Sequence, residues 1–471
     1  CTRWRTTPWP ATSCSSIDRK HGRQRGGARE WAMPYAPTAG AAAPDPAHFA
    51  KAVTNMGDKR PVVAHSAIYN NQGLKIVDKG IAVDAKLYER LVQHTLKSPL
   101  DDSLESEPGV TARVLREQVE ILLAREPFFA RMLATPRTRD MLLDGLGGLP
   151  IPPPIGFQLT LLRETQPELW LHSLRSAVTA GWLASRIEGT RYDVAMLAAG
   201  GLLHDLGMLH LDPVLLQPEI ELSGDQRRQL YTHPLLASML LERHHKFPRE
   251  LLRAILEHHE TLDGSGYPRN VSAASLSPWG RVLSLTEVVT AMFSPDRQAP
   301  ELRLSMVLRM NRHRYDETLV KEVMALLRPD ADAQAITAAA DPVSALREID
   351  GLLQRWPEVA AAVSAEAGSA KVDLAPLQEQ VGQIQRSLAG AGVSADQLDW
   401  LGETWREGTV AQELTLILHE VAWQLRSMTR QVRRRWRTAE GGLPAALGEW
   451  LASADALCAH ELSRGADSVP P

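Results

Sequence analysis

Apolar residues recur every three to four positions through most of the chain, which is the spacing of an amphipathic helix. The spacing is clear in VTARVLREQVEILLAREPFFARML, part of the stretch 87–146, and in the C-terminal run QELTLILHEVAWQLRSMTRQVRRRWR. The segment VVAHSAIYNNQGLKIVDKGIAV is different, because two β-rich runs flank the turn-prone residues 70–73. The pattern predicts a mostly all-α fold with one small hairpin near the N-terminus.

Breaks in the helical pattern divide the chain. Residues 148–155, GLPIPPPI, cannot continue a helix, because proline lacks a backbone N–H and clashes with the preceding turn. No repeat with a period of 20–50 residues is evident, so a solenoid is not supported. We predict an upstream segment and linker at 1–60, a small mixed α/β regulatory unit at 61–150, a histidine-rich helical domain at 151–330 and a C-terminal helical domain at 331–471.

Residues 1–32 differ in composition from the rest of the chain. They are basic, hold two of the 3 cysteines, and show neither a helical nor a strand period. They also lack the continuous apolar core of a signal peptide. We expect this segment to be disordered and to represent sequence upstream of a start at Met33 or Met56. A basic arm that binds nucleic acid is the alternative interpretation.

Composition narrows the classes of function. The hydrophobic fraction of 44% and the charged fraction of 23% are those of a globular protein. No apolar run approaches the roughly 18 residues of a membrane span, so we expect no integral membrane association. A net charge of -4 argues against a bulk electrostatic DNA binder. Three cysteines are too few for a disulfide framework, which favours a cytoplasmic location.

Candidate chemistry is concentrated in the third predicted segment, where eight of the 15 histidines fall between His172 and His259. The pair His204–Asp205 ends the apolar run AMLAAGGLL, which predicts an imidazole and a carboxylate at the buried end of a helix. An unpaired buried carboxylate costs free energy, so Asp205 needs a partner, and a metal ion can be that partner. A hydrogen-bonded core pair is the alternative for these two residues taken alone.

Further imidazoles and carboxylates lie on predicted helix faces and at helix ends. Glu168 and His172 stand four apart and share one face of a helix, and Glu287 lies inside the apolar helix RVLSLTEVVTAM. Such ligands without thiolates suit iron, manganese or another first-row divalent ion, and their number fits two or three ions. The remaining candidates are His233, ahead of a proline suited to a first helical turn, and His258, His259 and Glu260 at the end of LLRAILEHHE.

The order of these residues resembles that of the HD superfamily of metal-dependent phosphohydrolases. The run HHETLDGSGYP is similar to the HD-GYP subgroup, whose known members hydrolyse the bacterial second messenger cyclic di-GMP. The resemblance covers about residues 156–330 and implies a helical HD-GYP-like domain with two or three divalent ions, iron or manganese. The metal ligands that it implies are Glu168, His172, His204, Asp205, His233, His258, His259 and Glu287.

The resemblance also implies roles in catalysis and substrate binding. Asp205 is expected to act as a ligand shared between metals, and Glu260 to assist proton transfer. The residues expected near the substrate are Gly264, Gly266, Tyr267 and Pro268 of the signature loop, Arg281 of the closing helix, and Met208.

Three departures from the family pattern bear on activity. Met208 stands where the family has a lysine, so a cation expected beside the substrate phosphate is missing. Glu287 replaces a late aspartate ligand, and Thr290 replaces a second aspartate three residues later. Glutamate can still bind such a metal, so the loss at position 208 is the more serious of these changes.

Three hypotheses on function remain open at this stage. The leading one is a cytoplasmic bacterial signalling enzyme that hydrolyses a cyclic dinucleotide, with cyclic di-GMP as the favoured substrate. The second is a catalytically weak sensor or scaffold that binds metal or nucleotide, and the third is an HD phosphohydrolase for another nucleotide or phosphoester.

The C-terminal helix is the other candidate for a binding surface, because six arginines lie between Arg426 and Arg437. A solvated helix face or a dimer rim is one interpretation, and a site for an anionic membrane or a nucleotide is the other. The apolar run before these arginines predicts an interaction face, for a homodimer or a signalling partner.

Overall fold

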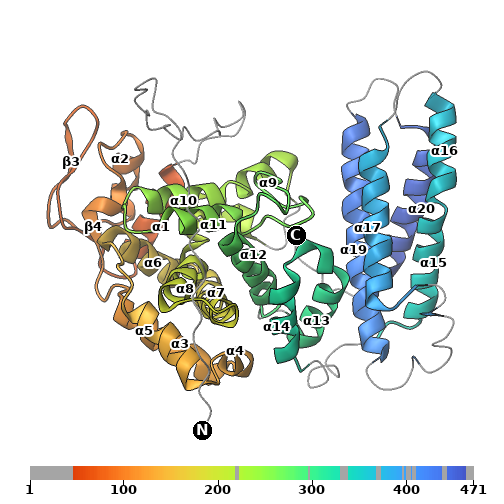
Figure 1. Cartoon of the computed structure of the whole chain (residues 1–471). Helices are drawn as coiled ribbons and strands as arrows, with labels where there is room; N and C mark the ends of the chain where they lie inside the picture. The colour runs from red at the N-terminus through yellow and green to blue at the C-terminus, as the bar shows by residue number, and fades with distance from the viewer. Residues whose placement is uncertain are drawn as a thin grey trace, which may run out of the picture. The chain divides into compact units, whose positions relative to one another are not determined.

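The structure is a computed structural model of the whole chain, and Figure 1 shows the order of its elements. The prediction for residues 1–32 lies outside the residues that the structure describes. Residues 42–471 form a single compact unit. The described residues are 46–217, 222–294, 297–328, 338–367, 373–394, 397–398, 405, 410–437 and 443–462.

The first described element is a helix, α1 (Pro46–Gly57), in a region that the sequence analysis assigned to a linker. Phe49, Val53 and Met56 are buried, because their spacing of four and three places them on one helix face against the core. The ring of Phe49 also stacks on His210 with a centroid distance of 4.5 Å. The linker prediction is therefore corrected for residues 46–57, which form a helix because the apolar side chains at 49, 53 and 56 pack into the core.

The predicted hairpin around residues 70–73 is confirmed. Strand β2 (Ile68–Tyr69) pairs antiparallel with β3 (Lys75–Val77). The turn is held by Asn70, whose side-chain oxygen accepts hydrogen bonds from the backbone N–H groups of Gln72 (3.0 Å) and Leu74 (2.8 Å). A second antiparallel pair joins β1 (Val63–Ala64) to β4 (Leu104–Glu105).

The helical prediction for residues 87–146 is wrong between Gln93 and Thr111. Between residue 85 and α3, the helical elements are the 3-10 turn η1 (Ala85–Leu87), α2 (Tyr88–Val92) and the 3-10 turn η2 (Leu100–Ser103), and β4 follows η2 directly. The pairing partner of β4 lies about forty residues upstream, as the register Ala64↔Leu104 shows. A local periodicity contains no information on such a partner.

The central region is a layered array of helices. Its elements are α3 (Ala112–Arg125), α4 (Pro127–Met132), α5 (Pro136–Gly147), α6 (Pro153–Thr165), α7 (Pro167–Arg186), α8 (Arg191–Leu203), η3 (Leu206–His210), η4 (Pro213–Leu216), α9 (Gly224–Leu230), α10 (His233–Glu242), α11 (Arg249–Glu257), α12 (Pro278–Ala291), α13 (Pro300–Met310), η5 (Arg312–Arg314) and α14 (Glu317–Leu326). Helix α8 is buried along almost its whole length, as its continuous apolar sequence predicts.

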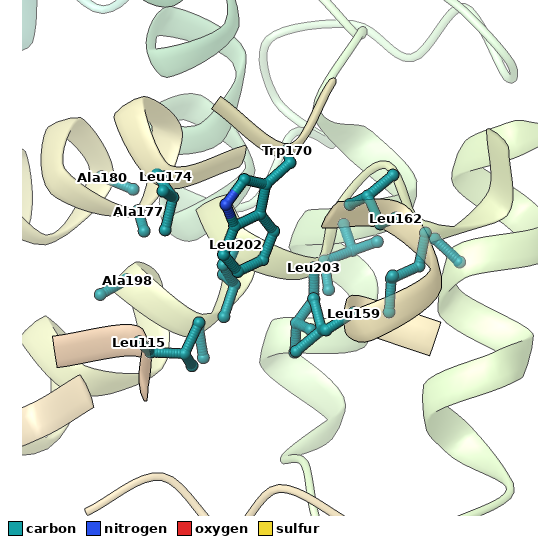
Figure 2. Packing of buried hydrophobic residues seen from close by; sticks show 14 of the residues in the cluster. Leu115, Leu159, Leu162, Trp170, Leu174, Ala177, Ala180, Ala198, Leu202 and Leu203 are labelled. Carbon is teal, nitrogen blue, oxygen red and sulfur yellow. The ribbon is translucent and has the colours of Figure 1, made fainter. Parts of the chain in front are cut away.

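One hydrophobic core extends from Phe49 of α1 to Val323 of α14. Figure 2 shows part of it, where Trp170 of α7 lies among leucines of α3, α6 and α8. The helix break predicted at 148–155 is confirmed for residues 148–152 and is wrong for 153–155, since α5 ends at Gly147 and α6 begins at Pro153, where proline fits a first helical turn. The core nevertheless continues across this break, so the N-terminal unit and the histidine-rich region fold around shared apolar side chains.

The helices that the structure describes from end to end in the C-terminal region are α15 (Pro342–Gln354), α16 (Trp356–Ala367), α17 (Ala375–Ala391), α19 (Val410–Arg437) and α20 (Ala445–Leu462). We call these five helices the C-terminal bundle. Their buried side chains form a second core, which also includes Leu302, Met306 and Met310 of α13. Helix α13 therefore attaches the bundle to the central region through a shared apolar surface.

The predicted fold class is confirmed: the protein is mostly all-α with a small mixed N-terminal part. None of the described helices has both the length and the apolar character needed to cross a bilayer.

A close crossing of α7 and α8 yields the first testable prediction. A Cβ atom added at Gly201 would lie 2.2 Å from the backbone oxygen of Ser176, and backbone atoms cannot move aside easily. We expect Gly201→Ala to lower the free energy of unfolding by about 1–3 kcal/mol, measured by urea denaturation. The matched control is Gly351→Ala in α15, where nothing lies within 4 Å and alanine should stabilise the helix by about 0.5–1 kcal/mol. Equal stability of the two variants would contradict the close crossing.

Candidate metal centre

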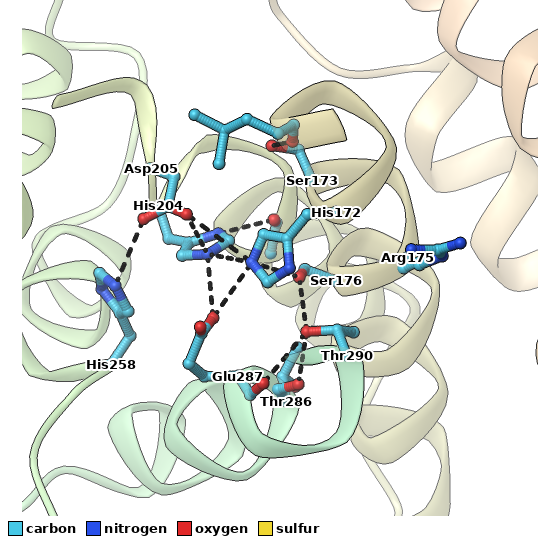
Figure 3. Close-up of polar contacts among 12 residues, drawn as sticks. His172, Ser173, Arg175, Ser176, His204, Asp205, His258, Thr286, Glu287 and Thr290 are labelled. Atoms are coloured by element: carbon cyan, nitrogen blue, oxygen red, sulfur yellow. Dashed lines mark hydrogen bonds and ion pairs between the residues drawn. The ribbon is translucent and has the colours of Figure 1, made fainter. Parts of the chain in front are cut away.

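Residues from five helical elements meet at one buried point between α7, α8, α10, α11 and α12. His172 comes from α7 and Glu287 from α12, and the other members sit at helix ends. His204 and Asp205 follow α8, His233 begins α10, and His258 and His259 follow α11. Figure 3 shows His172, His204, Asp205, His258 and Glu287 pointing toward one another.

The backbone fixes the orientation of three of these imidazole rings. The Nδ1 atom of His204 lies 2.9 Å from the carbonyl oxygen of Gly201, that of His233 lies 2.7 Å from Leu230, and that of His258 lies 2.6 Å from Ile255. A carbonyl oxygen only accepts hydrogen bonds, so Nδ1 carries the proton in each ring. In the neutral form that binds a metal, the Nε2 atom of each of these rings is a lone-pair acceptor aimed into the centre.

These Nε2 atoms lie very close to one another. The distance is 3.2 Å between His172 and His204, 3.2 Å between His233 and His258, and 3.1 Å between His259 and His233. Unprotonated nitrogens at this separation repel each other unless a cation lies between them. The donor set therefore fits bound metal ions, and imidazole with carboxylate suits first-row divalent ions.

The ligand atoms fall into two groups. Asp205, His233, His258 and His259 form one, and His172, His204 and Glu287 form the other. One carboxylate oxygen of Asp205, Oδ1, lies 3.3 Å from His233 Nε2, and the other, Oδ2, lies 3.3 Å from His204 Nε2. Asp205 thus presents one oxygen to each group and would be within reach of an ion held by either.

Buried acceptors in both groups lack hydrogen-bond donors. Asp205 Oδ1 and Glu287 Oε2 have no hydrogen-bond partner among the described residues. Glu287 Oε2 lies 3.2 Å from His172 Nε2 and 3.3 Å from His204 Nε2, so it points to the same place as these two imidazoles. An orphaned buried carboxylate oxygen is unfavourable, and a metal ion would satisfy both atoms.

The electrostatics show how strongly this centre attracts positive charge. Burial by itself would lower the pKa of His204, but the carboxylates of Asp205 and Glu287 raise it to about 10. Although burial opposes ionisation of Glu287, the nearby histidines hold its pKa well below the usual range. His259 is dominated by burial, which lowers its pKa to about 3 and keeps its ring neutral. A neutral imidazole is the form that binds a metal.

Behind the ligands, hydroxyl groups support the His172 side. Thr290, which stands where the family has an aspartate, donates a hydrogen bond to the carbonyl oxygen of Thr286 at 2.9 Å. Its oxygen lies 3.2 Å from that of Ser176, which in turn lies 3.5 Å from His172 Nε2. Thr290 is therefore part of the packing behind His172 (Figure 3) and is not among the two ligand groups.

The loop after α11 is folded tightly against the centre. Gly264 has a positive φ of 73°, and a Cβ added at Gly266 would lie 2.4 Å from the carbonyl oxygen of His259. The ring of Tyr267 stacks on His259 with a centroid distance of 4.4 Å and on Tyr231 with 3.9 Å. Tyr267 therefore holds the ring of a candidate ligand in place, and Pro268 follows it through a cis peptide bond.

Other predicted site residues lie away from the centre. Glu168 is exposed in the first turn of α7 and belongs to neither ligand group. Both carboxylate oxygens of Glu260 accept backbone hydrogen bonds, from Arg269 at 2.7 Å and Val271 at 3.1 Å. Arg281 bonds to Asp316 and to the carbonyl oxygen of Ala273. Glu260 and Arg281 thus hold loops in the structure, and the role predicted for Glu260 in proton transfer stays a prediction.

A cavity of about 670 Å³ opens beside the centre. His258, His259 and Glu287 line its inner end, together with Gly266 and Tyr267 of the signature loop. Among the described residues, Met208, Gly264 and Pro268 are not part of its lining. The other walls come from α9, η5, α17 and α19, so the cavity extends well beyond the histidine-rich helices.

Sequence reasoning missed several residues of this cavity. Tyr231 and Arg227 precede His233, and Arg314 lies in η5, outside every recognised motif. Trp423 and Arg426 line the opposite wall. The arginine-rich run in α19 was the one available signal, and sequence alone could not show which of its arginines face the cavity.

Comparisons with known proteins agree with this geometry. Residues 159–319 match the family model described as HD domain. The 3'3'-cGAMP-specific phosphodiesterase 3 of Vibrio cholerae is 30% identical over 121 residues, 26% of this chain and 26% of that protein. The cyclic di-GMP phosphodiesterase response regulator RpfG of Xanthomonas campestris is 29% identical over 122 residues, 26% of this chain and 32% of that protein.

The chain therefore spans about a quarter to a third of the length of these curated relatives. A solved structure, Bd1817, a HDG"Y"P protein from Bdellovibrio bacteriovorus, aligns with 57% of this chain and 94% of its own at 13% identity and a TM-score of 0.32.

The two ligand groups predict different metal losses in different variants. Asp205→Ala should remove both ions because its carboxylate faces both groups, whereas His172→Ala should remove one and leave the other. The measurement is metal content per chain by elemental analysis after anaerobic reconstitution with iron or manganese.

Glu168→Ala is the matched control, because Glu168 shares α7 with His172 but lies outside both groups. It should retain the metal content of the wild type. Loss of an ion in this control would mean that Glu168 is a ligand, as the family resemblance implied. Unchanged content in all three variants would contradict the assignment of the centre.

Proposed function

We propose that the protein is a metal-dependent phosphodiesterase that hydrolyses a cyclic dinucleotide, on the basis of residues 159–319, which match the family model described as HD domain. Cyclic di-GMP is the favoured substrate, with a role in bacterial cytoplasmic signalling. The observation that carries the proposal is the pair of ligand groups joined by Asp205 at the inner end of a large cavity.

The residues that would hold the metals are His172, His204 and Glu287 on one side and His233, His258 and His259 on the other, with Asp205 shared. Iron or manganese fits this donor set. Two such ions, when bound, supply Lewis acidity toward a phosphodiester and lower the pKa of water. Whether a third ion binds depends on Glu168, which the structure places at the surface.

The protein's own side chains shape the metal centre and exclude water from it. His204, Asp205, His233 and His258 are almost fully buried, which excludes bulk water and strengthens electrostatic interactions with a bound phosphate. Tyr267 fixes the ring of His259 by stacking, and the close approach of Gly266 places this loop at the cavity wall. A cavity of about 670 Å³ has the size of known sites for nucleotide-sized ligands.

A catalytically weak sensor is the second candidate, and one observation favours it. Met208 replaces a family lysine and lies half-buried in η3, so no ammonium is available at that position. A binding protein would keep the cavity and the metals while losing efficient turnover. The predicted homodimer or signalling partner at the C-terminal helices is compatible with both the phosphodiesterase and the sensor.

We expect metal-dependent hydrolysis of cyclic di-GMP that is abolished by Asp205→Ala, because this variant loses the ligand that faces both groups. The measurement is single-turnover hydrolysis with matched protein folding, verified by circular dichroism, using cyclic di-GMP, 3'3'-cGAMP and bis(p-nitrophenyl) phosphate in parallel. If the wild type hydrolyses all three substrates no faster than Asp205→Ala does, the sensor is favoured.

Met208→Lys tests whether the missing cation limits turnover. A charge-assisted hydrogen bond contributes roughly 1.5–3 kcal/mol, so a lysine that reaches the phosphate should raise the single-turnover rate about 10- to 150-fold. Met208→Leu is the control for a change of side chain without charge. Fast wild-type turnover that lysine reduces would mean instead that the site is built around Met208, for a different phosphoester.

A further inference from the structure

We propose that the C-terminal bundle completes the substrate site, and that Arg426 and Arg430 of α19 bind the phosphate of the cyclic dinucleotide that lies away from the metal centre. Trp423 would then provide the surface against which a base packs. This inference rests on the proposed function, since it assigns a specificity surface to the same cavity.

The cavity is lined on one side by the HD domain and on the other by the bundle. Its inner end is formed by His258, His259 and Glu287, and its far wall by side chains of α17 and α19. On α19 the lining residues include His419, Trp423, Arg426 and Arg430. A ligand that fills the cavity would therefore contact both the metal centre and the bundle.

Helical periodicity explains why these α19 residues share a wall. Trp423, Arg426 and Arg430 are spaced by three and four, which places them on one face of the helix. The other face carries Leu418 and Leu425, which are fully buried in the bundle core. Packing of the apolar face thus directs the aromatic and cationic face toward the cavity.

The bundle is held beside the HD domain by contacts adjacent to this wall. Arg309 of α13 donates a hydrogen bond to Glu413 of α19 at 3.3 Å, and Gln424 donates one to Asn311 at 3.5 Å. Asn311 and Gln424 both line the cavity. The buried side chains that α13 adds to the bundle core reinforce this attachment.

The charge of the far wall suits an anion. Arg426 and Arg430 line this wall from α19, and Arg227 lines the opposite side from α9. Of the two acids among the described lining residues, Asp263 lies 3.7 Å from Arg314 and 3.5 Å from His313, and Glu287 lies at the metal centre. Arg430 also contacts its neighbour, through a hydrogen bond from Nε to the carbonyl oxygen of Arg426 at 3.4 Å. Guanidinium groups bind phosphate oxygens strongly and with defined geometry.

The chemistry of the ligand requires such a second site. A cyclic dinucleotide carries two phosphodiesters on opposite sides of its ring, so one phosphate at the metal centre leaves the other exposed to the far wall. Its bases have flat aromatic faces, which pack favourably on tryptophan. A substrate with one phosphate and no base would have no group to place against the arginines and the tryptophan of this wall.

The bundle supplies a matched control on the same helix. Arg433 is directed to α20, where its guanidinium pairs with Asp455 at 2.7 Å, and it is not among the described residues that line the cavity. Arg433→Ala therefore removes one arginine from the same helix without removing a group from the proposed wall.

The experiment compares the double variant Arg426→Ala/Arg430→Ala with wild type and Arg433→Ala, all as metal-loaded full-length chains. We expect KM for cyclic di-GMP to rise about 10-fold or more in the double variant, and far more than KM for bis(p-nitrophenyl) phosphate. Arg433→Ala should leave both values at the wild-type level. The corresponding double lysine variant should recover most of the loss, because it restores the charge.

Binding is measured separately with a hydrolysis-resistant phosphorothioate analogue of cyclic di-GMP, by isothermal titration calorimetry. The double alanine variant should bind this analogue about 10-fold more weakly, and its affinity should depend less on salt concentration. Trp423→Ala should also weaken binding of the analogue.

These measurements separate this inference from the proposed function. If the wild type hydrolyses no substrate, the proposed function fails, and the titration still decides whether the arginine wall binds the analogue. If KM and the dissociation constant of the double alanine variant equal those of the wild type, the inference is wrong. A gain in kcat/KM for cyclic di-GMP would also overturn it, because the bundle would then obstruct the site.

Discussion

Burying five imidazole rings and two carboxylates around one point is favourable only if positive charge lies between them, and the rest of the site follows from this constraint. Three of the rings direct Nδ1 at backbone carbonyls, and the Nε2 atoms of neighbouring rings in the set of five lie 3.1–3.2 Å apart. Asp205 offers one oxygen to each half of the set. The protein thus builds an arrangement whose stability depends on cations, and the backbone around it is shaped to hold these acceptors together.

Helix ends and glycines make this convergence possible. Four of the five histidines lie at the start or just past the end of a helix, where the backbone can turn toward a common centre. A Cβ at Gly201 would collide with the backbone of α7, and one at Gly207 would lie 2.2 Å from the carbonyl oxygen of His233. Close approach of α7, α8 and α10 therefore sets the spacing of the ligands, and a loss of packing there would be a loss of metal affinity.

The cavity divides the proposed work between two parts of the chain. The HD domain provides the reactive end, with buried ligands and a loop fixed by the Tyr231–Tyr267–His259 stack. The bundle provides a wall with Trp423 and two arginines. Such a division would let the family chemistry remain constant while the bundle sets which phosphodiester is accepted.

The sequence by itself determined the helical class, the hairpin at residues 70–73, and the candidate ligands from His172 to Glu287, because periodicity, turn residues and a motif with fixed order are local properties. It could not show that α1 joins the core, that β4 pairs with β1, or that Glu168 faces solvent, since each depends on partners distant in sequence. It also could not show which arginines of α19 face the HD domain. The tertiary packing decided that, because burial of the apolar face of α19 in the bundle core, which also includes side chains of α13, fixes the rotation of α19 about its axis and so the side chains that reach the cavity.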